Sequence, residues 1–172
     1  MECDEPLPTR YAGNIVITLS APNMMDLLKL ACEPQEDERE QYLSMTGEDW
    51  IVDRVACDLY NRNGVQYVLL EDDQPICAGG FDPVIPGVWQ TWMLAKEGAW
   101  KDYGAAITKH SREMISELLK GPARRIECWA IASRVNACEW YEKGLKMERE
   151  STLRQYGVNG EDVAVYVKLR DQ

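Results

Sequence analysis

The sequence predicts an α/β (α+β) domain in which a mixed, mostly antiparallel sheet is covered by helices. The length of 172 residues fits one domain, so we expect residues 1–172 to fold as a single unit. Hydrophobic residues make up 45% of the chain, which is sufficient for a buried core. The patterns along the chain run strand, helices, several strands, helix, strand, helix and two strands, an order that is not that of a regular doubly wound fold.

The first part of the chain predicts one strand followed by helices. Residues 15–19 are short, β-branched and apolar, which is typical of a strand. Asn23 can cap a helix whose apolar residues recur at helical spacing. Residues 36–40 form an acidic run, which we expect to be a solvated helix face or a loop. Thr46 and Asp49 resemble the start of a further helix that stops near residues 63–64.

The character of the sequence changes after Gly64. Residues 65–70 and 76–81 predict the two strands of a hairpin, and residues 88–94, rich in aromatic and β-branched side chains, predict a third strand. A helix is expected from about residue 104 to residue 120. The remaining patterns predict a strand, a short helix and two more strands, at residues 125–131, 137–143, 147–156 and 163–169.

Charge and hydropathy exclude several classes of protein. The net charge is −10, whereas nucleic-acid-binding proteins usually carry a basic patch, so we expect no nucleic-acid partner and a preference for cationic partners such as amines. No apolar run reaches the ~20 residues of a membrane span. Residues 1–5 lack the features of a secretory signal, so we expect a cytoplasmic protein.

The six cysteines do not predict a metal site or a disulfide framework. None lies in a C-x-x-C pair, and the chain has a single histidine, so well-spaced zinc ligands are lacking. We expect reduced, partly buried thiols. Cys138 is not expected to be a nucleophile, and His110 falls on the apolar stripe of its helix, which favours a structural role.

A first candidate site lies where the strand at 88–94 leads into the next helix. Backbone amides at the start of a helix are unsatisfied and favour anions, and small residues let a phosphate come close. The same residues also suit a tightly packed turn. They are Lys101, Asp102, Tyr103, Gly104, Ala105 and Ala106.

A second candidate site follows the strand at 125–131. Tyr141 lies on a predicted short helix, where its phenol can face a cleft. With an ordinary pKa near ~10, a tyrosine is a suitable acid for a departing thiolate. The alternative is that Trp140 and Tyr141 are aromatic core residues.

Together the two sites resemble the GNAT superfamily of acyl-CoA-dependent N-acyltransferases. The first is similar to its cofactor loop, [QR]-x-x-G-x-[GA], at Gly104 and Ala106. The second is similar to its motif N-x-x-A-x-x-x-Y-x-x-x-G-F at residues of the stretch 136–145. The matching positions there are Asn136, Tyr141, Gly144 and Leu145.

The resemblance implies a sheet with helices on both faces and two splayed strands that form a cleft for acetyl-CoA. The backbones of Met93 and Ala95 would bind the pantetheine arm, and the amides of residues 102–106, after Lys101, would hold the pyrophosphate. Asn136 would contact the cofactor near the sulfur, Tyr141 would protonate the leaving thiolate, and no metal would be needed. The acceptor would be a small-molecule or protein amine. From the residues themselves, either a carboxylate or a water chain near the cleft would take the amine proton, and Asp82, at the end of a predicted strand, is the candidate carboxylate.

A narrower resemblance concerns the aromatic stretch at residues 88–94, which is similar to GNAT-like proteins among the virion genes of T7-like tailed phages. It implies an alternative in which the fold is a non-catalytic interaction or virion assembly protein. The location would then be the host cytoplasm or the virion. The sequence leaves the acceptor open, and it equally leaves open a homo-oligomer.

Overall fold

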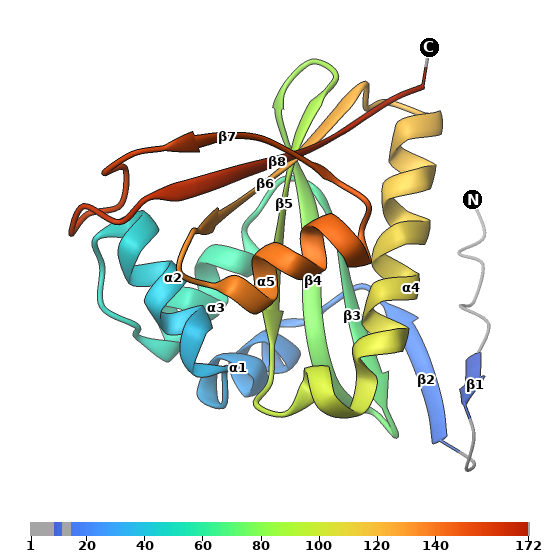
Figure 1. The fold of residues 1–172 in the computed structure, drawn as a ribbon. Coiled ribbons are helices and arrows are strands. Elements are labelled where there is room, and N and C mark those ends of the chain that lie inside the picture. Colours follow the sequence, from blue (N-terminus) through green and yellow to red (C-terminus); the bar gives the residue numbers. More distant parts are fainter. Residues whose placement is uncertain (1–8, 12–14, 172) are drawn as a thin grey trace.

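One eight-stranded sheet organises the chain (Figure 1). The computed structural model describes residues 9–11 and 15–171. Within these residues the strand order is β1-β2-β3-β4-β5-β6-β8-β7, and every neighbouring pair is antiparallel except β5 and β6. The mostly antiparallel mixed sheet predicted from the sequence is therefore confirmed. The strands are β1 Thr9–Tyr11, β2 Ile15–Ser20, β3 Val65–Glu71, β4 Gln74–Ile85, β5 Val88–Ala95, β6 Arg125–Ile131, β7 Glu148–Leu153 and β8 Val163–Leu169.

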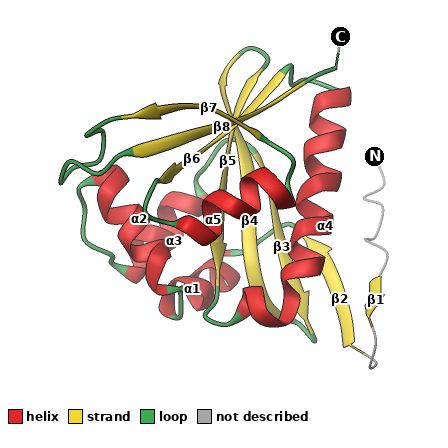
Figure 2. Cartoon of the chain, viewed as in Figure 1, coloured by secondary structure: helices red, strands yellow, loops and turns green. Residues whose placement is uncertain are grey.

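Helices cover both faces of the sheet (Figure 2). The helices α1 and α3 pack on one face, where Val68, Ala78 and Leu94 are buried against them. The long helix α4 packs on the other face. None of the helices in the described part of the chain combines the length and apolar character needed to cross a bilayer. The helices are α1 Met24–Cys32, α2 Glu36–Thr46, α3 Val52–Tyr60, α4 Ala99–Lys120, α5 Val135–Glu139 and the π-helix η1 Trp140–Gly144.

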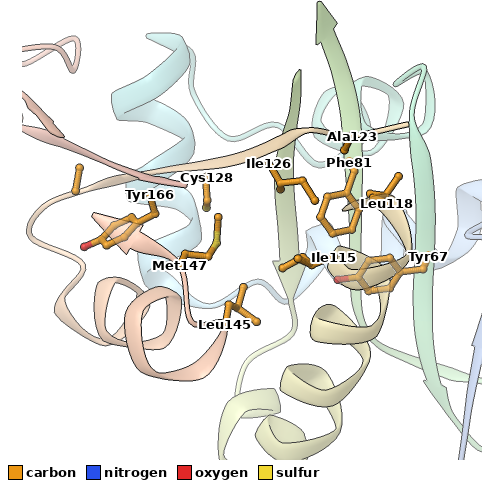
Figure 3. Close-up of a cluster of buried hydrophobic side chains, with 11 residues drawn as sticks. Tyr67, Phe81, Ile115, Leu118, Ala123, Ile126, Cys128, Leu145, Met147 and Tyr166 are labelled. Carbon is orange, nitrogen blue, oxygen red and sulfur yellow. The ribbon is translucent and has the colours of Figure 1, made fainter. Parts of the chain in front are cut away.

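Alternation along the strands produces the core under α4 (Figure 3). Tyr67 and Phe81, from β3 and β4, point from the sheet toward Ile115 and Leu118 of α4. The same core continues to Ile126 and then to the side chains beneath the second half of the sheet. Successive strand residues point to opposite faces, so each strand supplies one row to this core and one row to the α1 and α3 face. The two faces of the sheet therefore have separate apolar layers.

Most elements lie where the sequence predicts them. Strands β6 and β8 have the predicted bounds, and Asn23 caps α1 in a reciprocal capping box with Asp26. Two helix starts are wrong. Thr46 ends α2 instead of starting α3, because the next residue, Gly47, adopts a left-handed φ of 74° and its amide donates to the carbonyl of Leu43 at 2.8 Å. The helix expected from residue 104 begins at Ala99, after Gly98 adopts a left-handed φ of 78°.

The one parallel pair in the sheet is short. Strands β5 and β6 pair only between Val88–Gln90 and Arg125–Glu127. Beyond this point β5 continues to pair with β4, and β6 continues to pair with β8. The two strands therefore separate in the middle of the sheet. The splayed strands that the sequence resemblance implies are present in the structure.

Candidate active site

A cavity of about 530 Å³ lies where β5 and β6 separate. Its lining comes from both strands, from α2 and α3, and from the segment after β6. Five of the six tryptophans in the chain line it, so its walls are strongly aromatic. A volume of this size holds a small-molecule ligand. The five are Trp50, Trp92, Trp100, Trp129 and Trp140.

The acidic run on α2 contributes a buried carboxylate to this cavity. Glu38 is 9% exposed, and burial raises its pKa from 4.5 to about 7. Arg134, whose side chain is 8% exposed, opposes this shift: its Nη2 lies 3.3 Å from Glu38 Oε1 and its Nε lies 3.0 Å from Asp37 Oδ2. The expectation of a wholly solvated acidic face is thus wrong at Glu38. A carboxyl with this pKa can accept or release a proton near neutrality.

Gln41 fixes α2 to the edge of β6 that β5 leaves open. Its side-chain amide donates to the carbonyl of Trp129 at 3.3 Å, and its Oε1 accepts from the amide of Ile131 at 2.9 Å. The glutamine thus replaces a strand partner for β6. Figure 1 shows α2 and α5 side by side at this end of the sheet, where Arg134 binds Asp37. The hydrogen bonds of Gln41 and the ion pair between Arg134 and Asp37 therefore hold α2, which carries Glu38, against the point where β5 and β6 separate. We call this point of separation the splay.

Replacing Gln41 by alanine should destabilise the protein and loosen the attachment of α2, which carries Glu38, to β6. The variant loses both hydrogen bonds to β6, which corresponds to about 1–3 kcal/mol for strand groups left unpaired. Urea unfolding measures this loss. Glu40→Ala, at an exposed position on the same helix, serves as the control and should stay within about 0.5 kcal/mol of the parent. Equal stabilities of the two variants would exclude the bridging role.

Tyr141 lies on the floor of the cavity at the start of η1. Its ring packs at 5.3 Å from the rings of Trp140 and Tyr166, measured between centroids. Burial and the neighbouring Cys128 raise the pKa of Tyr141 well above its ordinary value of 10. The phenol therefore keeps its proton over the physiological pH range. Its role as a proton donor stays a prediction; burial keeps the proton on the phenol but makes it a weaker acid.

Among the other residues predicted to bind the cofactor, some line the cavity and some do not. Met93 and Asn136 line the cavity. Ala95 does not, because it is fully buried and its carbonyl accepts a hydrogen bond from the amide of Gln35 at 3.3 Å. The backbone contact expected at Ala95 is thus already used within the protein.

The residues of the expected phosphate loop lie inside helix α4. The helix begins at Ala99, so the amides of residues 103–106 are in its interior, where helical hydrogen bonds satisfy them. In the first turn, the amides of Lys101 and Asp102 lie 3.1 and 3.4 Å from the carbonyl of Gly98. The hydroxyl of Tyr103 donates to Glu71. The helix start therefore lacks the row of free amides that a pyrophosphate needs. The residues of this interior segment are Tyr103, Gly104, Ala105 and Ala106.

Aromatic side chains also join the start of α4 to η1. The rings of Trp100 and Trp140 meet edge to face, with centroids 4.7 Å apart. The indole of Trp140 donates to the hydroxyl of Thr108 at 2.9 Å. These contacts bridge α4 and the Tyr141 segment, the two places to which the resemblance assigns the pyrophosphate and the leaving thiolate.

Three further residues weighed from the sequence lie away from the chemistry. Asp82 forms an ion pair of 2.6 Å with Arg62 and is not part of the cavity lining. His110 is buried on α4, and its Nδ1 lies 3.1 Å from Glu113. Cys138 packs beside the main core, with its sulfur 4.0 Å from the carbonyl of Ile131. Every cysteine in the described part of the chain is a free thiol.

Solved structures that are similar to this chain over most of its length include acetyltransferases. A GNAT-family acetyltransferase from Bacillus anthracis has a TM-score of 0.70 and 12% identity, over 91% of this chain and 96% of that one. A ribosomal-protein-alanine N-acetyltransferase from Brucella melitensis has a TM-score of 0.70 and 16% identity, over 88% and 98%. This chain has the GNAT fold.

A third solved structure is the ribosomal L7/L12 alpha-N-protein acetyltransferase RimL in complex with coenzyme A. Its TM-score is 0.69 and its identity 12%, over 94% of this chain and 97% of that one. No protein-family model and no curated protein sequence matches the chain. The similarity is therefore one of fold.

The residues of this GNAT fold suit one part of coenzyme A better than the other. The splay between β5 and β6 is open and lined by Met93, Cys128 and Tyr141, which fits a narrow thioester arm. The start of α4 does not fit the pyrophosphate, because the amides of Ala99, Lys101 and Asp102 are engaged within the helix or with the preceding turn. No contact to the nucleotide follows from these residues.

The match to the GNAT motif changes when its spacing is counted from Tyr141 instead of from Asn136. Counting the family spacing back from Tyr141 reaches Arg134, and the motif alanine falls on Ala137. Arg134 is the residue that binds Asp37 and Glu38 inside the cavity, whereas Asn136 is exposed on α5. Arg134 was missed because an asparagine was expected, and Glu38 because it lies in an acidic run.

Proposed function

We propose that this chain is an N-acyltransferase that moves an acyl group, most simply acetyl, from a coenzyme A thioester to an amine. The supporting observation is that Glu38 and Tyr141, one titrating near neutrality and one holding its proton, line the same cavity at the splay of a GNAT fold. Amine acylation needs both a group that removes a proton from nitrogen and a group that keeps one to give.

The chain's own residues divide this work. The carboxylate of Glu38, which Arg134 holds in place through an ion pair, accepts a proton from the acceptor nitrogen. Tyr141 holds a proton on its phenolic oxygen at the floor of the cavity. The aromatic walls exclude water from the space between them. When bound, the thioester supplies the activated acyl group.

Two measurements test this function. Acetyl-CoA and acetyl-pantetheine, which lacks the nucleotide, are each mixed with the protein and a panel of primary amines, and free thiol release is followed. We expect thiol release that requires both protein and amine, together with a rise in the melting temperature on adding either thioester. Absence of both effects at millimolar thioester would contradict the proposal.

Tyr141→Phe should lower the turnover of this reaction by roughly 10²-fold while leaving the affinity for the thioester unchanged. The change removes only the hydroxyl, so the aromatic contacts with Trp140 and Tyr166 remain. Steady-state rates and isothermal titration separate the two effects. Tyr156→Phe, at an exposed tyrosine outside the cavity, is the control. Full turnover in Tyr141→Phe would remove the phenol from the proton path.

A second candidate is a non-catalytic interaction or virion assembly protein that retains the GNAT fold. The contact between Trp100 and Trp140 favours it, because these rings bridge the start of α4 and the Tyr141 segment. So do the engaged amides at the start of α4. On the first candidate the protein acts in the cytoplasm, and on the second it is part of the host cytoplasm or the virion. Co-purification with a large assembly, without any melting shift on adding a thioester, would favour the second.

A further inference from the structure

The charges of the cavity are unevenly distributed. Its two arginines each have a carboxylate partner: Arg62 lies 2.6 Å from Asp82, and Arg134 lies 3.0 Å from Asp37 and 3.3 Å from Glu38. Among the described residues that line the cavity, no arginine is left without a carboxylate. A phosphate or carboxylate ligand would therefore have to compete with these ion pairs.

The negative charge of the lining gathers on one wall. Asp37 and Glu38 are adjacent on α2 and share a single guanidinium, which leaves an excess of negative charge when both are ionised. An ammonium placed beside them would restore neutrality in a partly dehydrated site, where charge interactions are stronger than in water. This wall suits one cationic group, because no other carboxylate is found among the described residues that line the cavity.

The remaining walls of the cavity are aromatic and aliphatic, so they favour an apolar group on the ligand. Tyr42 and Trp50 meet edge to face with centroids 5.4 Å apart, and Trp92 faces the same cavity from β5. Met45, Val55 and others add aliphatic surface. Aromatic rings of a ligand pack favourably against such edges and faces, and a cation nearby is also attracted to them. A volume of about 530 Å³ exceeds what a short alkylamine would fill.

We propose that the cavity binds a primary amine joined by a short chain to an aromatic ring, with the ammonium beside Glu38 and Asp37 and the ring against Tyr42, Trp50 and Trp92. This deepens the proposed acyltransferase function, on which it rests for its catalytic meaning, by naming the class of acceptor. A polyamine would need several separated carboxylates, and the lining offers one pair.

Isothermal titration without any thioester tests this binding. The probes are 2-phenylethylamine, its neutral analogue 2-phenylethanol, and spermidine, at about pH 8, where Glu38 is ionised. We expect 2-phenylethylamine to bind at least about tenfold more tightly than either of the others, as a charge-assisted contact to a buried carboxylate requires. Equal binding of the alcohol, or tighter binding of spermidine, would overturn the proposal.

Variants assign the binding to the cavity. Glu38→Gln should remove the advantage of the amine over the alcohol, whereas Glu40→Gln, exposed on the same helix, should leave it unchanged. Tyr42→Leu, on the aromatic wall, should weaken the binding of 2-phenylethylamine and 2-phenylethanol to the same extent. This variant tests the cavity independently if Glu38→Gln does not fold. An amine advantage that survives in folded Glu38→Gln would overturn the assignment.

The outcome is separable from that of the proposed function. Binding of 2-phenylethylamine without thiol release from either thioester would support this site and contradict the acyltransferase. Thiol release with other amines, but no binding of 2-phenylethylamine at millimolar concentration, would support the acyltransferase and contradict this acceptor class. The two proposals can therefore fail independently of each other.

Discussion

Glu38→Gln is expected to lower acyl transfer by roughly 10²- to 10³-fold, the range for loss of a general base. Glutamine keeps the shape of the side chain and its contact with Arg134, but it cannot accept a proton. The affinity for the thioester should stay unchanged, because Glu38 lies on α2 and not on the strands of the splay. Initial rates under saturating thioester measure the effect, with Glu40→Gln as the matched control.

The pH dependence supplies a second readout of the same residue. Burial raises the pKa of Glu38 to about 7, so the base form appears as the pH rises through that value. Turnover of the parent protein should therefore rise with pH across neutrality. This rising limb of the pH–rate profile should be absent in Glu38→Gln. A variant that stays within about threefold of the parent, or that keeps the limb, would show that another group removes the proton.

The fold was predictable because its strands and helices carry strong local signals. Residues 125–131 alternate less buried side chains with buried apolar ones, residues 163–169 carry valine at every second position up to Val167, and both segments fold with the predicted bounds. Asn23 caps α1 because its side-chain oxygen accepts a hydrogen bond from the backbone amide of Asp26, which has no partner within the helix. The start of α4 was mistaken because Gly104 resembled a loop glycine, whereas the left-handed residue that begins the helix is Gly98.

The site was predictable only in part, because tertiary contacts decide which polar residues are buried. Tyr141 faces the cavity as expected. Glu38 lies in an acidic run that has every local feature of a solvated surface, and it is buried only because Gln41 and Arg134 hold α2 against the splay. Asp82 has the right chemistry for a base, but Arg62 from the end of α3 pairs with it. Neither contact leaves a signal in the local sequence.

Arg134→Met should destabilise the protein by about 3 kcal/mol or more at pH 8, since removing one partner leaves a buried charge unpaired. Methionine retains the aliphatic length of the side chain but removes the guanidinium that lies 3.3 Å from Glu38. The pKa of Glu38, already about 7, should rise further because the charge that opposes burial is lost. The limb of the pH–rate profile should move to higher pH with it.

The sign of the pH effect on stability separates this explanation from a simple packing defect. The pKa of Glu38 in the folded protein lies above its ordinary value of 4.5, so its contribution to stability falls as the pH rises from there through the folded pKa. In Arg134→Met this fall is larger, because it extends to a higher folded pKa, and the loss of stability should be clearly smaller at about pH 5 than at about pH 8. Arg39→Met, at an exposed position on α2, should change stability by less than about 0.5 kcal/mol at either pH. A loss in Arg134→Met that is independent of pH would mean that Arg134 acts through packing alone and leaves Glu38 electrostatically unaffected.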